Sequence, residues 1–109
     1  MDTFSALADP TRRRIVEMLG AGEIAAGHIT ACFDMSAPAI SQHLKVLREA
    51  GLVAVRPEGQ RRLYRLERSG WDELQAWVDR VTEFWPQRLD ALEDALRKAA
   101  DENGGKDHE

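Results

Sequence analysis

The sequence has few of the residues that build disulfides, metal centres or membrane spans. It contains a single cysteine, Cys32, in 109 residues, which excludes an intramolecular disulfide and a zinc site made of several cysteines. No apolar run approaches the roughly 18 residues that a membrane-spanning helix needs, and the amino terminus lacks the apolar stretch of a signal peptide. We therefore expect a cytoplasmic protein.

Catalytic constellations are missing as well. The sequence shows no nucleophile–base pair, no glycine-rich phosphate loop and no clustered pair of carboxylates. Its length fits one domain, and 43% hydrophobic with 31% charged residues is ordinary for a globular protein. A chain of this size builds only a modest core, so we expect a partner subunit to add stability. The prediction is a binding protein and not an enzyme.

What the chain does have is a separation of charge along its length. The net charge is −4, which is unusual for a protein that binds nucleic acid. Residues 36–68 nevertheless hold seven basic and three acidic side chains, whereas residues 71–109 hold five basic and eleven acidic ones. Such segregation is expected when one part of a protein faces phosphate, although two solvated faces would give the same counts.

Helix start and stop signals divide the first third of the chain. A short helical turn is predicted over 4–8, and Asp9 followed by Pro10 is a favourable start for a second helix over 10–19. Glycines follow, and the spacing of apolar residues then predicts a third helix over 23–33. Three consecutive arginines in the first turn of the second helix oppose its dipole. They indicate a nearby phosphate or acidic partner, unless they are simply solvated.

The middle of the chain carries the clearest functional pattern. Ser36 is a good N-cap, Pro38 lies in the first turn and Gly51 follows the last one, so we predict a helix over 37–50. Its apolar residues repeat at i, i+4 and i+7 from Ile40 and form one inward stripe. The outward side is short-chained, polar and basic, and it holds Ala37, Ser41, Gln42, Lys45 and Arg48.

Two strands are predicted next, over 52–56 and 61–66, because both segments are rich in valine, leucine and tyrosine. In the connection between them, Gly59 can supply the positive φ that the turn needs. Tyr64 is either one of the residues through which this hairpin contacts DNA or partly a core residue. The hairpin is basic and carries Arg56, Arg61, Arg62 and Arg65. After two helices joined by a short turn, it predicts a winged helix-turn-helix: a mostly α fold with a small β-hairpin.

The remainder of the chain is predicted to be one long amphipathic helical region. Ser69 caps it, its apolar residues keep helical spacing for more than six turns, and Pro86 should kink or divide it. This apolar surface exceeds what a domain of about seventy residues can cover, so we expect a subunit interface. Residues 1–100 are thus expected to form the DNA-binding and dimerisation domain, and 101–109 a disordered polar tail.

Three stretches resemble the ArsR/SmtB family of winged-helix repressors: ALADPTRRRI at 6–15, SAPAISQHLKVLREAGLV at 36–53 and EGQRRLY at 58–64. The resemblance spans residues 3–98, and its specific part is the pattern Ser-x-His-Leu-x-x-Leu-Arg-x-Ala-Gly-Leu-Val. It implies a homodimer joined through its first and last helices, which binds a palindromic operator in double-stranded DNA and is released by a metal or another signal. Residues 84–92 resemble a branch of the family that often lacks metal sites.

The metal ligands that the family uses are missing from this chain. By register with the family, its Cys-x-Cys positions are Ala25 and Gly27 here. Family members that sense zinc or nickel use histidine and aspartate pairs on the last helix, and the last helix predicted here has no histidine. His28 and Cys32 lie at i and i+4, so a metal- or redox-responsive repressor that uses them is an alternative. We predict no metal site, no cofactor, an unknown effector and a small core residue in Cys32.

Side-chain chemistry suggests roles on the DNA-binding surface. Glutamine suits the adenine edge and serine is permissive, so Gln42 and Ser41 are the predicted base contacts. Lys45 and Arg48 are placed for phosphate or guanine, while His43 either contacts phosphate or packs. The full predicted set is Ser36, Ala37, Ser41, Gln42, His43, Lys45, Arg48, Arg56, Arg61, Arg62 and Tyr64.

Apolar residues near both ends of the chain form the predicted dimer interface. They are Phe4, Leu7, Trp71, Leu74, Trp77, Val78, Val81, Phe84, Trp85, Leu89 and Leu92. The tryptophans among them could instead line an effector pocket. A winged helix that serves only protein–protein interaction also remains open. Such a module would tolerate loss of charge on the predicted DNA-binding face, whereas a repressor needs that charge.

Overall fold

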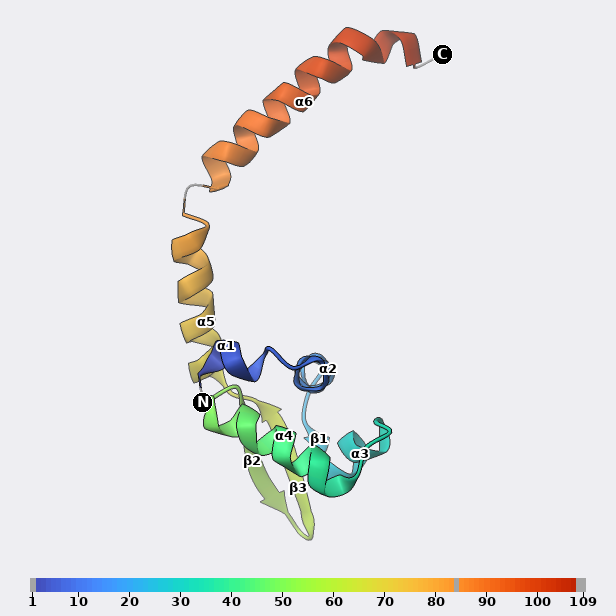
Figure 1. The fold of residues 1–109 in the computed structure, drawn as a ribbon, viewed down its shortest axis with the longest axis vertical. Helices are drawn as coiled ribbons and strands as arrows, with labels where there is room; N and C mark the ends of the chain where they lie inside the picture. Colours follow the sequence, from blue (N-terminus) through green and yellow to red (C-terminus); the bar gives the residue numbers. More distant parts are fainter. Residues whose placement is uncertain (1, 84, 108–109) are drawn as a thin grey trace. The chain divides into compact units, whose positions relative to one another are not determined.

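The computed structural model describes residues 2–83 and 85–107 and divides the chain into two units, Met1–Gln75 and Ala76–Glu109. The elements are α1 (Thr3–Ala6), α2 (Pro10–Leu19), β1 (Ile24–Ala25), α3 (Ala26–Ala31), α4 (Ala37–Glu49), β2 (Val53–Glu58), β3 (Arg61–Leu66), α5 (Arg68–Val81) and α6 (Trp85–Asp107) (Figure 1). The predicted mostly α fold with a small β component is confirmed. No helix within the described ranges is long and apolar enough to cross a membrane.

The predicted capping signals start the two principal helices of the first unit. Asp9 caps α2, because its Oδ2 accepts a hydrogen bond from the backbone N–H of Arg12 at 3.1 Å. Ser36 caps α4 in the same way, with its Oγ 3.2 Å from the backbone nitrogen of Ala39. Both side chains satisfy N–H groups that have no partner inside the helix. The predicted second and fourth helices are confirmed.

The predicted helix over 23–33 is wrong in its first part. Ile24 and Ala25 form strand β1, which pairs antiparallel with Tyr64 and Leu63 of β3, and α3 follows directly. The hairpin therefore belongs to a three-stranded sheet with the order β1-β3-β2. Apolar spacing could not separate the two possibilities, because Ile24 packs against the core from a strand as it would from a helix.

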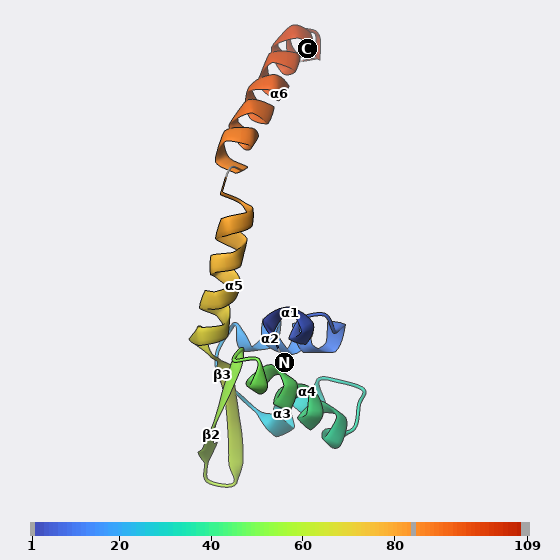
Figure 2. The ribbon, with the colours of Figure 1, turned by 60° about the vertical axis from the view of Figure 1, so that its left-hand side comes forward.

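Strands β2 and β3 form the predicted hairpin, with a shorter turn than expected. β2 includes Pro57 and Glu58, which were assigned to the connection, so that only Gly59 and Gln60 remain between the strands. Proline is tolerated there because β2 is an edge strand. Gly59 has the predicted positive φ, 63°. The tip of the hairpin projects beyond the helices of the first unit (Figures 1 and 2).

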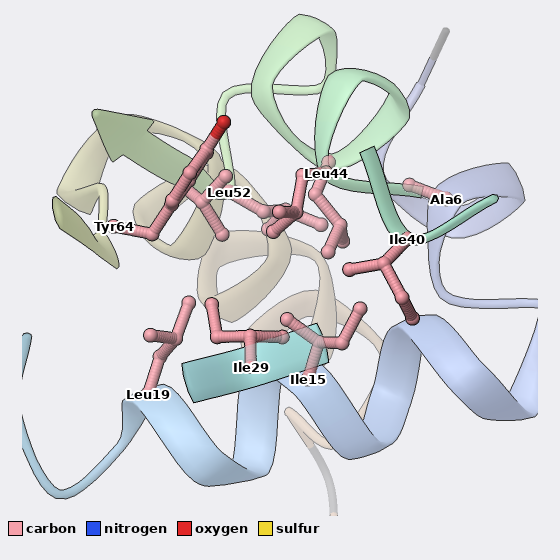
Figure 3. Close-up of a cluster of buried hydrophobic side chains, with 10 residues drawn as sticks. Ala6, Ile15, Leu19, Ile29, Ile40, Leu44, Leu52 and Tyr64 are labelled. Atoms are coloured by element: carbon pink, nitrogen blue, oxygen red, sulfur yellow. The ribbon is translucent and has the colours of Figure 1, made fainter. Parts of the chain in front are cut away.

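The core of the first unit lies between the sheet and the helices. Figure 2 shows α3 and α4 on the same side of the sheet, and side chains from α1 to α4 and from β3 converge in one cluster (Figure 3). The predicted inward stripe of α4 is part of it and is confirmed. The cluster consists of Ala6, Ile15, Leu19, Ile29, Ile40, Leu44, Leu47, Leu52, Val53 and Tyr64.

Gly51 ends α4 as predicted. Its φ is 76°, and its N–H donates to the carbonyl of Arg48 at 3.0 Å. The N–H of Leu52 donates to the carbonyl of Leu47 at the same distance. These two hydrogen bonds form a Schellman motif, which satisfies carbonyls that the last turn leaves without a helical partner and requires a left-handed residue at the position of Gly51.

The predicted cap of the next helix is wrong. α5 begins at Arg68, so Ser69 is its second residue, and the first turn holds no acidic side chain. The N–H of Gly70 donates to the carbonyl of Gly51 at 2.9 Å. A backbone acceptor from the end of α4 thus takes the place of a side-chain cap.

The long helical region is divided, as Pro86 predicts. α5 ends at Val81 and α6 begins at Trp85, with Pro86 as its second residue. A proline in the first turn removes no intrahelical hydrogen bond. α6 continues to Asp107, so that most of the segment predicted as a disordered tail is helical in the structure. The last two residues lie outside the described ranges.

Candidate nucleic-acid interface

Helix α4 turns its apolar stripe into the core and its polar side outward. The stripe consists of Ile40, Leu44 and Leu47, and each of these residues is at most 2% exposed. At about 100° per residue, Lys45 lies on the side of the helix opposite this stripe, flanked by Ser41 and Gln42. All three are exposed. This face is the one that the sequence predicted for DNA contact.

A polar groove of about 420 Å³ lies between this face of α4 and strand β3. The helix supplies serine, glutamine, lysine and arginine side chains, and the strand supplies an arginine and a tyrosine. The lining residues, called the groove below, are Pro38, Ser41, Gln42, Lys45, Arg48, Arg62 and Tyr64. The fold therefore brings together residues of the predicted DNA-binding set that come from two separate elements.

The hairpin divides its arginines between two faces. Side chains alternate along β3, so Arg62 and Tyr64 point to one face while Arg61 and Leu63 point to the other. Arg62 lines the groove. The guanidinium of Arg61 instead lies 3.4 Å from a carboxylate oxygen of Glu58. The arginines that the sequence grouped as one basic wing are thus not equivalent.

Arg56 shares the face of Arg61 and is held by acidic side chains. Its Nε and Nη2 each donate to a carboxylate oxygen of Glu23 at 2.8 Å, and Nη2 also lies 3.4 Å from Glu58. The hydrogen bond from Arg56 lowers the pKa of the Glu23 carboxyl, and the same bond raises the pKa of Arg56. The structure places this predicted DNA contact in an ion pair outside the groove.

Tyr64 is a core residue that also borders the groove. Its residue is only 5% exposed and belongs to the core cluster. In Figure 3 its hydroxyl points away from Ile15 and Ile29, and the residue lines the groove. The buried ring therefore fixes the position of β3 against the helices while the residue borders the polar surface.

His43 lies on the flank of α4 that is turned away from the groove. Its Nδ1 is 3.3 Å from Nη1 of Arg12 and 3.9 Å from Oδ2 of Asp9, and its side chain is 18% exposed. Partial burial acts to raise the pKa of the Asp9 carboxyl, but the backbone N–H of Arg12 and the nearby positive charges outweigh it and lower that pKa. Of the two predicted roles of His43, this geometry favours packing.

The arginines at the start of α2 have structural partners within the chain. Arg12 donates to the carbonyl of Ala6 at 2.6 Å, and Arg13 donates to the carbonyl of Leu7 at 2.8 Å. These carbonyls lie at the C-terminal end of α1, where positive charge is favourable. Arg12 and Arg13 are therefore explained without a phosphate or an acidic partner.

The remaining predicted residues lie at the start of α4. Ser36 uses its hydroxyl as the N-cap acceptor, and Ala37 is exposed as the first helical residue. Pro38, which the sequence predicts only as a helix-start signal, also lines the groove. Its position three and seven residues before Ser41 and Lys45 places it on their face of the helix, and this spacing is a signal that could have identified it.

The alternative metal or redox site is an exposed pair. Cys32 is exposed at the C-cap of α3, which corrects its assignment to the core. His28 is exposed on the same helix. Within residues 2–83 and 85–107, no group of three or more histidine, cysteine, aspartate or glutamate side chains is arranged to hold a metal ion.

The residues predicted at the dimer interface separate into two groups. Leu7 and Trp71 pack against the core of the first unit, and Trp71 donates from Nε1 to the carbonyl of Leu52 at 3.0 Å. Leu74 is partly buried, and Phe84 lies outside the described residues. The others are between 37% and 55% exposed, namely Phe4, Trp77, Val78, Val81, Trp85, Leu89 and Leu92, and Leu96 is 62% exposed.

Comparison with known proteins gives consistent matches. A family described as a helix-turn-helix domain matches residues 7–56. The HTH-type transcriptional regulator Rv2034 of Mycobacterium tuberculosis is 48% identical over 79% of this chain and 78% of its own length. The transcriptional repressor SdpR of Bacillus subtilis is 35% identical over 71% of this chain and 86% of its own length.

A solved structure agrees with these matches. The crystal structure of a possible transcriptional regulator for arsenical resistance superposes with a TM-score of 0.70 at 44% identity. The match covers 84% of this chain and 95% of that one. The likeness therefore extends over the described fold beyond the helix-turn-helix segment alone.

Proposed function

Because this chain belongs to the ArsR family of winged-helix transcriptional regulators, we propose that it is a homodimeric repressor that binds a specific operator in double-stranded DNA. In this proposal α4 is the recognition helix in the major groove, and the β2–β3 hairpin is the wing, on the DNA backbone or the minor groove. A twofold-symmetric dimer presents two recognition helices, so the operator is palindromic.

The groove is the observation that supports this proposal. It combines three cations, Lys45, Arg48 and Arg62, with two hydrogen-bonding side chains that are short enough to approach base edges closely. Cations interspersed with neutral polar groups suit a ligand that presents both phosphates and base edges. Gln42 and Ser41 are the proposed base contacts, with Gln42 suited to an adenine edge.

The second unit supports the homodimer. On α6, Trp85, Leu89, Leu92 and Leu96 follow a spacing of four, three and four residues, and each is more than half exposed. This spacing places them on one stripe of the kind that packs against a second helix. We propose that the same helix of a second copy covers this stripe.

We further propose that the signal that releases the repressor is not a metal. Ala25 and Gly27 occupy the positions of the family's Cys-x-Cys pair and carry no ligating atoms. His28 and Cys32 offer two donors at most from one helix, whereas a closed zinc site uses four. An effector that does not require such ligands accounts better for this set of side chains.

The decisive test of DNA binding compares two adjacent arginines of the wing. Arg62→Ala should weaken binding to the DNA upstream of the protein's own gene and lower the slope of log affinity against log salt by about one unit per protomer. Arg61→Ala, the matched control on the other face of β3, should leave that slope unchanged. Fluorescence anisotropy between low and moderate salt concentrations measures both quantities.

Two results would contradict this assignment. Equal losses for the two variants would mean that the wing contacts DNA without distinguishing its faces. No loss for either variant, or for Ser41→Ala combined with Gln42→Ala, would favour a winged helix used only for protein–protein interaction. In a folded protein, that module needs neither the charge nor the polar groups of the groove.

The dimer is tested separately. Leu89→Asp introduces a charge into the apolar stripe of α6 and should give monomers, whereas Asp90→Asn on the neighbouring position should leave the assembly unchanged. Sedimentation equilibrium distinguishes the two states. A folded and fully dimeric Leu89→Asp protein would remove the stripe from the interface.

A further inference from the structure

Arg56 is a wing arginine whose guanidinium is already occupied. Two of its nitrogens bind the two carboxylate oxygens of Glu23, each at 2.8 Å. This is the bidentate geometry in which an arginine–carboxylate pair is strongest and most directional. Such a pair fixes the orientation of both side chains, in contrast with an ordinary surface ion pair.

The pair links the two outer strands of the sheet. Glu23 immediately precedes β1, and Arg56 lies on β2, while β3 runs between them. Arg56 and Ala25 are both register partners of Leu63, so the ion pair spans the central strand next to this residue. β1 and β3 pair over only two residues each. A link across β3 therefore adds substantially to the few backbone bonds that join the wing to the segment before α3.

The charge of Glu23 makes a role in direct DNA contact unfavourable. A carboxylate near a phosphate backbone repels it, and the effect is only partly screened at distances shorter than about 8 Å at physiological salt. A residue that only tuned the charge of the wing would favour DNA binding more if it were neutral. The geometry points instead to a mechanical role.

We propose that Glu23 and Arg56 are positioning residues that clamp the wing so that Arg62 and Tyr64 face the recognition helix. The proposal rests on the proposed function of the groove in DNA binding. Arg56, which a charge count assigns to DNA, acts through Glu23 and the sheet. The clamp and the groove lie on opposite faces of the hairpin, so the clamp can hold the wing without obstructing DNA.

The electrostatic and the positioning interpretations of Glu23 predict opposite changes in DNA affinity for one substitution. Glu23→Gln removes a negative charge, so simple electrostatics predicts tighter binding to any DNA. The clamp predicts weaker binding to the operator, by about two- to fivefold, which is the range that exposed ion pairs of good geometry can contribute. Random DNA, which needs less exact placement of the groove residues, should lose less affinity.

The experiment measures anisotropy of labelled upstream DNA and of a random duplex with three proteins. These are the wild type, Glu23→Gln and Glu17→Gln. Glu17 is exposed on α2, and its side chain makes no ion pair in the described part of the chain, so it controls for the loss of one charge.

A second measurement needs no DNA. Amide hydrogen exchange of the hairpin should be about two- to fivefold faster in Glu23→Gln than in the wild type, while exchange in α4 stays unchanged. Unchanged hairpin exchange overturns the clamp. So does tighter operator binding by Glu23→Gln. If the wild type binds no DNA, the proposed function fails, and the exchange measurement still decides the clamp.

Discussion

Replacing Gly70 with alanine should destabilise the fold through a clash between two backbone segments. A Cβ atom at this position would lie 2.5 Å from the carbonyl oxygen of Gly51 and 2.7 Å from its carbonyl carbon. Both are backbone atoms, held by the hydrogen bond from Gly70 N–H and by the turn that ends α4. Neither can rotate away as a flexible side chain would.

The size of the effect follows from three contributions. Forcing an extra carbon into a closely packed site costs about 1–3 kcal/mol, and loss of the Gly70–Gly51 hydrogen bond costs about 1 kcal/mol more. Alanine is the better helix former by at most about 1 kcal/mol. The net loss is therefore about 1–3 kcal/mol, which for a domain of this size lowers the melting temperature by roughly 5–15 °C.

Gly27 offers the matched control. It lies in α3, and a Cβ atom there would meet no atom within 4 Å, so Gly27→Ala should leave stability unchanged or raise it by up to about 1 kcal/mol. Thermal and urea unfolding followed by circular dichroism, at one protein concentration, compares the variants. A Gly70→Ala protein at least as stable as the wild type would refute the steric argument.

Three further changes test other contacts. Asp9→Asn keeps a capping oxygen but loses the negative charge. Because folding lowers the pKa of Asp9, the stability of the wild type should fall more steeply than that of the variant as the pH drops below about 4. Trp71→Phe should cost about 1 kcal/mol in urea unfolding, through loss of the bond to Leu52. His43→Ala should lower the melting temperature without changing the salt slope of DNA binding. Lys45→Ala should lower the salt slope without changing the melting temperature. A lowered salt slope for His43→Ala would mean that His43 contacts DNA.

Helices α2 and α4 were predictable because their signals are local. Asp9 and Ser36 each cap a helix through a hydrogen bond to the backbone three residues on, and Gly51 ends one through its own positive φ. Strand β1 was not predictable in this way. It consists of two residues whose partner strand lies almost forty residues later, and nothing next to Ile24 in the sequence signals that pairing.

The same distinction applies to the candidate site. Helical spacing correctly selected the outward residues of α4, because all of them belong to one element. Charge alone could not separate Arg62 from Arg56, since the partner that occupies Arg56 is Glu23, thirty-three residues earlier. Strand alternation does carry part of the answer, because it places Arg61 and Arg62 on opposite faces before any partner is known.

The salt dependence of DNA binding follows from this division of charge. Residues 36–68 contain seven basic side chains, and if all of them met phosphate, a dimer would show a slope of log affinity against log salt near −13. Only Lys45, Arg48 and Arg62 line the groove. A dimer with three such cations per protomer should give a slope of about −5. Titrations at several salt concentrations measure this slope directly, and a value near −13 would show that the arginines on the far face of the wing also leave their acidic partners for DNA.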